Sequence, residues 1–224
     1  MLTEGQLERR KSGLGGSDIA AILGISPWAT PIDVWMEKTE KVAPRVVKSE
    51  AMLWGTVLEP VILSEYARRM EVGLYAIPEE DTPVRHPERS WQCGTPDSLI
   101  IPGWLNPEPA DSELEPGDSE PMPYADVLKE ALGGLECKAV GMRKSREWGD
   151  SGTDEVPRYY RVQSEWYRSI FGFPVWEMVV LIGGQDFRVY TLPKSERLEN
   201  HMLEKAERFW THNVQGDNPP RAAA

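Results

Sequence analysis

The order in which hydrophobic patterns change along the chain constrains its fold more than any other feature. Apolar residues recur at helical spacing in the first third of the sequence, and shorter strand-like segments follow them. A further helix, a hairpin and a last helix complete the chain. This order predicts an α/β fold in which helices flank a central β-sheet of mixed direction. We expect a single domain over residues 1–224, because α/β domains commonly reach about 200–250 residues.

Capping and turn residues set the expected limits of these elements. Ser17 and Asp18 are candidate helix N-caps, and Pro31 and Pro157 suit the start of two further helices. The short helix that begins near Ser17 and Asp18 is expected to end at Gly24, and two further helices are expected over residues 50–70 and 194–214. The expected strands are LYAIP, SWQC, DSLIIP, GGLECKAV and the two arms of a hairpin through GGQD. Four tryptophans are expected in the core rather than stacked on nucleic-acid bases: Trp28, Trp35, Trp54 and Trp166.

An acidic, proline-rich insertion at about residues 104–126 separates two of the expected strands. Between Asn106 and Glu130, eight acids are opposed only by Lys129, so this stretch contributes −7 to the net charge of −11. We interpret it as a mobile surface insertion. The remaining residues carry only −4, and an acidic chain can bind DNA where basic residues converge and carboxylates hold a divalent metal.

Several classes of protein are excluded or disfavoured by what the sequence lacks. Two cysteines, Cys93 and Cys137, cannot hold an iron–sulfur cluster that needs four thiolates from one chain. Three scattered histidines disfavour a zinc site, and the phosphate-binding motif GxxxxGK[ST] does not occur. No apolar run reaches the roughly 18 residues of a membrane span, and no apolar signal segment opens the chain. We therefore expect no membrane association and a cytoplasmic location.

Three charged residues on two strand-like segments form a candidate chemical site. Asp97 follows Pro96 at the start of DSLIIP, and Glu136 and Lys138 lie two residues apart in LECKAV. The alternation of a strand places Glu136 and Lys138 on one face and Cys137 on the other. If the two strands are neighbours, Asp97 and Glu136 can chelate one hard divalent cation, Mg²⁺ or Mn²⁺.

Five segments of the chain, in the same order, resemble those of one nuclease family. GTPDSLI and LECK are similar to the paired signature of PD-(D/E)xK nucleases, which have a restriction-endonuclease-like core. GLGGSDIAAILGISPWATPIDVWMEKT, LWGTVLEP and VQSEWY resemble segments of the YqaJ-like phage recombinase family, to which lambda exonuclease is related. The resemblance covers roughly residues 10–190. The long insertion departs from the family, whose members commonly join these strands by a short turn.

The resemblance implies the roles of the central residues. Asp97 and Glu136 are expected to bind metal, and Lys138 is expected to be the catalytic lysine. Glu59 is expected to bind the metal directly or through water, and the backbone carbonyl of Cys137 is expected to complete the ligand set. A bound Mg²⁺ or Mn²⁺ would activate water and reduce the charge of the scissile phosphate.

Four further residues are implied to support this site or to bind DNA. Gln163 would position Lys138 or substrate, with Tyr167 one helical turn away as support. Arg10 and Ser17 would bind a DNA 5′-phosphate. In the alternative interpretations, Arg10 is a solvated surface residue and Ser17 only caps its helix.

The activity implied by the resemblance is 5′-to-3′ exonuclease digestion of linear double-stranded DNA, dependent on Mg²⁺. The 3′ single strands left behind would pass to a single-strand annealing protein, as in phage recombination, and the enzyme would be a homotrimer. Two alternatives remain. One is a PD-(D/E)xK endonuclease, and the other is a DNA-binding or assembly module that does not cut.

Overall fold

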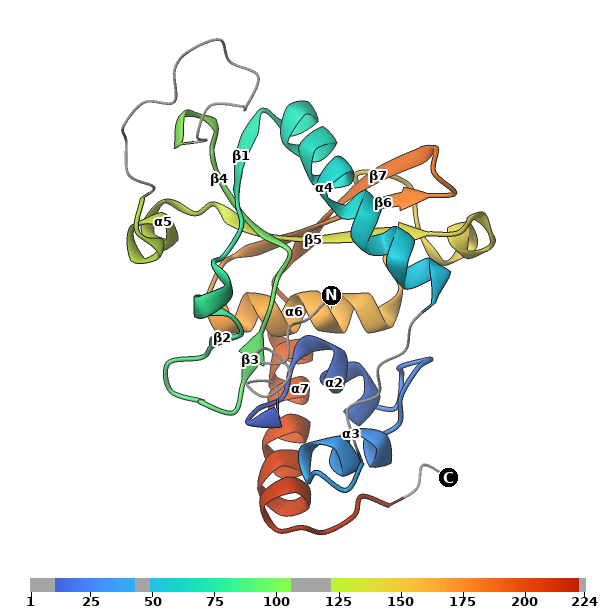
Figure 1. The fold of residues 1–224 in the computed structure, drawn as a ribbon, viewed down its shortest axis with the longest axis vertical. Helices are drawn as coiled ribbons and strands as arrows, with labels where there is room; N and C mark the ends of the chain where they lie inside the picture. Colours follow the sequence, from blue (N-terminus) through green and yellow to red (C-terminus); the bar gives the residue numbers. More distant parts are fainter. Residues whose placement is uncertain (1–10, 43–48, 106–121, 222–224) are drawn as a thin grey trace.

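The computed structural model describes residues 11–42, 49–105 and 122–221. Its centre is a five-stranded sheet in the order β1-β4-β5-β6-β7 (Figure 1). The strands are β1 (Val72–Tyr75), β4 (Ser98–Pro102), β5 (Gly133–Val140), β6 (Val175–Ile182) and β7 (Asp186–Pro193). Neighbours β5 and β6 are parallel, and the other three neighbouring pairs are antiparallel. The sheet is therefore mixed in direction, as the sequence predicted.

Local chemistry explains how the last three strands are connected. A parallel pair needs a crossover connection, and the segment between β5 and β6 contains helix α6 (Arg158–Phe171). Strands β6 and β7 instead form the hairpin predicted through GGQD. Gly183 and Gly184 in its turn have φ angles of +61° and +75°, which glycine adopts without steric cost.

Helices cover both faces of the sheet in two main apolar cores, and a smaller cluster joins β4 to the segment around Val127. Helix α4 (Glu50–Met70) packs through Ile62 and Tyr66 on Cys137 and Val179. On the opposite face, Trp166 of α6 packs with alternate residues of β6. This second core also includes α2 (Gly16–Ile22), α3 (Pro31–Lys38), α7 (Glu196–Arg208) and the π-helix Phe209–Gln215, which lie on the α6 side in Figure 1. None of the helices in the described ranges combines the length and apolar character needed to cross a membrane.

The start of α2 differs from the prediction that Ser17 or Asp18 is its N-cap. Gly15 is the N-cap, and the Asp18 carboxylate accepts a hydrogen bond from the Gly15 amide at 2.8 Å. Asp18 also forms a buried ion pair with Lys38 of α3 at 2.9 Å. The carboxylate therefore closes a capping box and ties the two helices together, while Ser17 is exposed in the first turn.

Two of the four tryptophans expected in the core are exposed. Trp35 and Trp166 are buried, with 8% and 0% of their surface exposed, but Trp28 and Trp54 are 60% and 55% exposed. The prediction for Trp28 and Trp54 was therefore wrong. In α4 the reason is that helical spacing continues beyond the part of the helix that packs on the sheet. Ile62 and Tyr66 are buried, whereas other members of the apolar stripe are largely exposed, among them Leu53, Trp54, Val57 and Val61.

The segments around the predicted insertion are more structured than expected. Residues 106–121 lie outside the described ranges. The edges of the predicted insertion form the 3₁₀ helix Gly103–Leu105 and helix α5 (Tyr124–Glu130). Val127 is buried, and the Tyr124 ring stacks on Tyr75 with centroids 6.3 Å apart. The predicted strand SWQC reduces to β3 (Cys93–Gly94), which pairs with β2 (Val84–Arg85) in a separate two-stranded sheet.

We predict that Gly134→Ala destabilises the fold by about 1–3 kcal/mol, because its methyl group has no room in the core. The added carbon would lie 2.2 Å from the Cη2 atom of Trp176, which is fully buried. Gly55→Ala is the matched control, since within the described ranges no atom from outside the neighbouring backbone lies within 4 Å of a methyl group there. Gly55→Ala should stabilise α4 by about 0.5–1 kcal/mol. Urea unfolding of both variants measures the difference, and equal stabilities would contradict the packing argument.

Candidate active site

Asp97 lies where strand β4 separates from strand β5. The β4–β5 ladder pairs Ser98 with Leu135, and Asp97 immediately precedes it. At this point the Asp97 carboxylate replaces a backbone partner: its Oδ2 atom accepts a hydrogen bond from the Cys137 amide at 2.7 Å. The condition that the Asp97 and Glu136 strands be neighbours is therefore met, and the hydrogen bond fixes Asp97 beside β5.

Strand alternation separates the polar and apolar residues of β5 as predicted. Glu136 and Lys138 are paired in register with Met178 and Val180 of β6, which belong to the core on the α6 face. Cys137 belongs to the opposite core, beneath α4. The charged pair is consequently held on the side of the sheet that α6 covers.

Glu136 is the most buried of the candidate site residues, with only 2% of its surface exposed. Its Oε1 atom accepts hydrogen bonds from the Lys138 ammonium and from the Gln163 Nε2 atom, the latter at 2.7 Å. Gln163 Nε2 also lies 3.2 Å from the Tyr167 hydroxyl. The Oε2 atom of Glu136 is buried and has no hydrogen-bond partner in the described part of the chain. One carboxylate oxygen is therefore held in place, and the other is left to bind something further.

The charged groups shift one another's pKa values strongly. Burial, reinforced by the charge of Asp97, raises the pKa of Glu136 to about 8, although Lys138 acts in the opposite direction. Burial also raises the pKa of Asp97, against the lowering effects of Lys138 and of the Cys137 amide. Burial alone would lower the pKa of Lys138, but Glu136 and Asp97 raise it above its ordinary value. The lysine therefore stays protonated, and an additional positive charge would favour ionisation of both acids.

Glu59 reaches the same electrostatic environment from helix α4. It is partly buried, and its pKa is raised by burial and by the charge of Asp97, with Lys138 lowering it. Three carboxylates thus approach Lys138 from three elements: Glu59 from α4, Asp97 from the start of β4 and Glu136 from β5. This is the set that the sequence resemblance implied.

The donor atoms suit a hard divalent cation that keeps part of its water shell. No three His, Cys, Asp or Glu side chains within the described ranges form a ready-made metal cluster. The unpartnered Oε2 atom of Glu136 is nevertheless a free oxygen donor in a negatively charged surrounding. The Cys137 carbonyl points toward the Asp97 side of β5, since the amide and carbonyl of one strand residue point the same way. Mg²⁺ commonly binds to one or two carboxylates and completes its coordination with several waters. Asp97 and Glu136 can provide the carboxylates.

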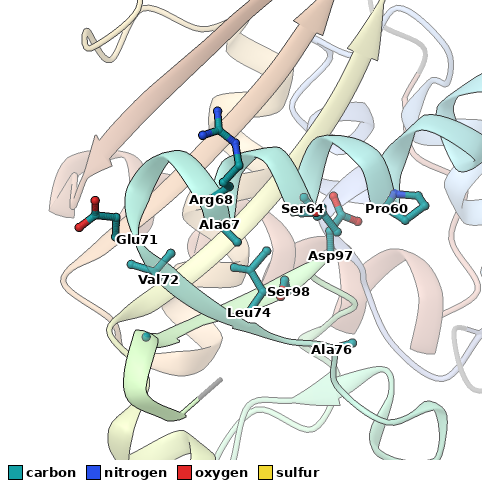
Figure 2. A pocket seen from close by; sticks show the side chains of 12 residues that line it. Pro60, Ser64, Ala67, Arg68, Glu71, Val72, Leu74, Ala76, Asp97 and Ser98 are labelled. Carbon is teal, nitrogen blue, oxygen red and sulfur yellow. The ribbon is translucent and has the colours of Figure 1, made fainter. Parts of the chain in front are cut away.

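A groove gives access to Asp97 from the α4 side of the sheet. It encloses about 760 Å³ between α4 and strands β1 and β4. In Figure 2 the Asp97 carboxylate lies at one end of the groove beside Pro60 and Ser64, whereas Arg68 and Glu71 lie toward its other end. A ligand can therefore approach Asp97 without displacing the α6 side of the site.

Helix α6 contributes one site residue that the sequence interpretation missed. The Tyr160 ring centroid lies 5.3 Å from the Lys138 Nζ atom, in a cation–π contact. Tyr160, Gln163 and Tyr167 are spaced by three and four residues, so they share one face of the helix. This spacing was visible in the sequence, but only the fold shows that the face covers β5.

The residues expected to bind a 5′-phosphate are only partly described. Arg10 lies outside the described residues. Ser17 is exposed in the first turn of α2, next to Gly16, which packs closely on α6: a methyl group at Gly16 would lie 2.8 Å from the Gln163 Cγ atom. The start of α2 is therefore adjacent to the site, and the role of Ser17 remains a prediction.

The sheet topology and the flanking helices define a restriction-endonuclease-like α/β fold. Residues 6–173 match the YqaJ-like viral recombinase domain, and the chain belongs to this family. It is 29% identical over 217 residues to the uncharacterized protein YqaJ of Bacillus subtilis (strain 168), in an alignment that covers 96% of this chain. The chain spans only 57% of that relative's length.

Solved structures support the assignment of the fold. An alkaline exonuclease from Laribacter hongkongensis, LHK-Exo, superposes with a TM-score of 0.64 at 12% identity, covering 96% of this chain and 94% of that one. The structure of LHK-Exo in complex with dAMP gives the same TM-score and coverage at 13% identity. At such low identity, the similarity establishes a shared fold.

We predict that Glu136 makes the metal-free protein less stable as the pH rises from about 5 to 8. In this range the folded state keeps a proton on Glu136, whereas the unfolded chain, with an ordinary pKa of 4.5, has lost it. The contribution can approach about 1.4 kcal/mol per pH unit. Lys138 is protonated in both states and adds no slope.

Urea unfolding in EDTA, for the wild type and Glu136→Gln, measures this effect. The free energy of unfolding of the wild type should fall relative to that of the variant as the pH rises. Asp97 and Glu59 are present in both proteins, so their contributions largely cancel. Parallel pH profiles would show that Glu136 titrates at its ordinary value.

Proposed function

We propose that the chain is a Mg²⁺-dependent deoxyribonuclease that digests linear double-stranded DNA from its ends. The observation that carries this proposal is the buried Glu136 carboxylate, which is bound to Lys138 and Gln163 through one oxygen and unpartnered at the other. Asp97 lies beside it on the neighbouring strand. A carboxylate pair with an adjacent lysine suits phosphodiester hydrolysis, because a phosphate needs both a bound cation and a fixed positive charge.

Each candidate site residue has a definite part in this proposal. Asp97 and Glu136, with Glu59 and the Cys137 carbonyl, would hold Mg²⁺ or Mn²⁺. When bound, the ion would lower the pKa of a coordinated water and reduce the charge on the phosphate. Gln163 orients the Glu136 carboxylate, and Tyr167 supports Gln163. Lys138, placed between Glu136 and the Tyr160 ring, presents its ammonium to the nucleophile or to the phosphate.

Family membership supports the choice of an end-directed enzyme. The chain belongs to the YqaJ-like viral recombinase family, and its fold is shared with an alkaline exonuclease that has been crystallised with dAMP, a deoxynucleotide. We propose 5′-to-3′ polarity, with Arg10 and Ser17 binding the terminal 5′-phosphate. The remaining 3′ strand would be passed to a single-strand annealing protein, and the enzyme would act as a homotrimer.

We predict that Lys138→Ala lowers the rate of cleavage of linear duplex DNA in Mg²⁺ by at least about 100-fold, because it removes the fixed charge beside the phosphate. Lys129→Ala is the matched control: Lys129 lies on the surface of α5 and pairs with its near neighbour Asp126 at 2.6 Å. Initial rates on a labelled duplex measure both, with thermal melting to confirm that the variants fold.

Excess EDTA should abolish cleavage, and Mn²⁺ should restore it. Calcium should bind but support little turnover, because its looser coordination geometry positions water poorly. A Lys138→Ala enzyme that cleaves as fast as the Lys129→Ala control would remove the lysine from the mechanism. Undiminished cleavage in EDTA would remove the metal.

We predict that linear duplexes are digested and closed circular duplexes are not, since an exonuclease needs an end. Cleavage of the circle would indicate an endonuclease.

Arg10→Ala should slow digestion of 5′-phosphorylated ends more than that of 5′-hydroxyl ends, because a guanidinium binds a terminal phosphate through paired hydrogen bonds. Matched duplexes that differ only in this phosphate provide the measurement. Equal losses on both kinds of end would remove Arg10 from end recognition.

A further inference from the structure

Trp28 is displayed on the surface by a turn whose backbone is fixed. The turn connects α2 and α3, and the Ser26 hydroxyl accepts hydrogen bonds from the amides of Trp28 at 3.2 Å and Ala29 at 3.3 Å. Thr30 then caps α3, with Asp33 closing the capping box. The indole is nevertheless 60% exposed. An exposed apolar side chain marks a binding surface where it belongs to a larger apolar patch, and Trp28 adjoins two tyrosine rings.

The neighbours of Trp28 connect it to the candidate active site. Its ring lies 4.9 Å from that of Tyr159, nearly edge-on at 80°, and 6.0 Å from that of Tyr160. The Tyr160 ring is in turn 5.3 Å from the Lys138 Nζ atom. The two distances, 6.0 Å and 5.3 Å, place the indole at most 11.3 Å from the lysine. In a stacked strand, with about 3.4 Å per base, this is a reach of about three nucleotides.

A basic segment lies beside these rings in a chain whose net charge is −11. The 3₁₀ helix Met142–Glu147 directly follows β5 and carries Arg143, Lys144 and Arg146 against one acid, Glu147, which gives a local charge of 3 − 1 = +2. Lys144 Nζ lies 6.0 Å from the Tyr159 ring centroid. Arg143 and Arg146 are exposed and form no ion pair with another residue of the described ranges.

The Tyr159 ring is held in place by the same segment. Its hydroxyl donates a hydrogen bond to the Glu147 carboxylate at 2.8 Å, and Glu147 also pairs with Lys144 at 3.1 Å. Tyr159 and Tyr160 pack against each other with centroids 4.5 Å apart. The partly buried Tyr159 is therefore held by its contacts with Glu147, Tyr160 and Trp28, whereas the Trp28 indole stays 60% exposed beside it.

We propose that Trp28 and Tyr159 form a stacking ledge for unpaired DNA bases, next to the phosphate at Lys138. The basic segment 142–147 binds the backbone of the same strand. Exposed aromatic rings beside a basic track are how proteins bind single-stranded nucleic acid without sequence preference. The inference rests on the proposed function, since it takes DNA to be the substrate. It explains why this turn places its indole outward rather than in the core.

The test is equilibrium binding of a fluorescein-labelled single-stranded oligodeoxynucleotide in EDTA, followed by anisotropy. Trp28→Ala should raise the Kd by roughly 5- to 150-fold, the range for loss of one base stack. Trp28→Phe should retain most of the affinity because a ring remains. Trp104→Ala is the matched control, since Trp104 is 75% exposed on the 3₁₀ helix Gly103–Leu105, outside the ledge. Its Kd should equal that of the wild type.

Salt dependence separates stacking from charge. Trp28→Ala should leave the slope of log Kd against log salt concentration unchanged, whereas Arg143→Gln should reduce it by about one. Sedimentation velocity of the wild type and Trp28→Ala tests the alternative that Trp28 lies between two copies of the chain. A changed molecular mass with an unchanged Kd would overturn the ledge, and so would equal affinities of Trp28→Ala and Trp104→Ala.

The ledge and the nuclease can fail separately. Wild-type protein that binds the oligonucleotide through Trp28 but cuts no duplex in Mg²⁺ would support the ledge and contradict the proposed nuclease. Wild-type protein that cuts duplex DNA, while Trp28→Ala binds and cuts as well as Trp104→Ala, would overturn the ledge and leave the nuclease in place.

Discussion

Asp97 meets the Cys137 amide at the point where two antiparallel strands separate, and the site depends on this contact. The β4–β5 ladder ends at Ser98, so the edge of β5 beyond Leu135 needs another partner. The Asp97 carboxylate provides it at 2.7 Å. This hydrogen bond brings a charge against β5, on the side to which the Cys137 carbonyl also points. A continuous ladder would have placed backbone there and left no room for a ligand.

The buried Glu136 carboxylate is costly to the fold and useful to a site. Burial and the nearby Asp97 charge raise its pKa to about 8, while Lys138 and Gln163 compensate only one of its oxygens. Such an arrangement is tolerated because large apolar cores lie on both sides of the sheet. Groups with strongly shifted pKa values are common at functional sites, because catalysis and ligand binding need such groups. A bound cation would relieve the repulsion that the two acids now share.

Much of the site was predictable because it depends on short sequence separations. Strand alternation places Glu136 and Lys138 on one face of β5 and Cys137 on the other face. Helical spacing places Gln163 one turn from Tyr167. The adjacency of the Asp97 and Glu136 strands was a condition that the sequence could state but not establish. The prediction that large apolar side chains are buried was wrong for Trp28 and Trp54, which are exposed. Apolar character indicates a preference for burial, but whether a partner surface exists depends on how the helices are placed.

The sequence by itself determined the type and order of the main helices and strands, the motif residues and the mixed α/β class, because these follow from local periodicity and chain order. Tertiary structure alone decided that Tyr160 lies against Lys138, that one oxygen of Glu136 is unpartnered, and that Trp28 stands beside Tyr159. These contacts join the α2–α3 turn, β5 and α6 across long sequence separations. Their geometry depends on packing over the whole sheet, which no local pattern encodes.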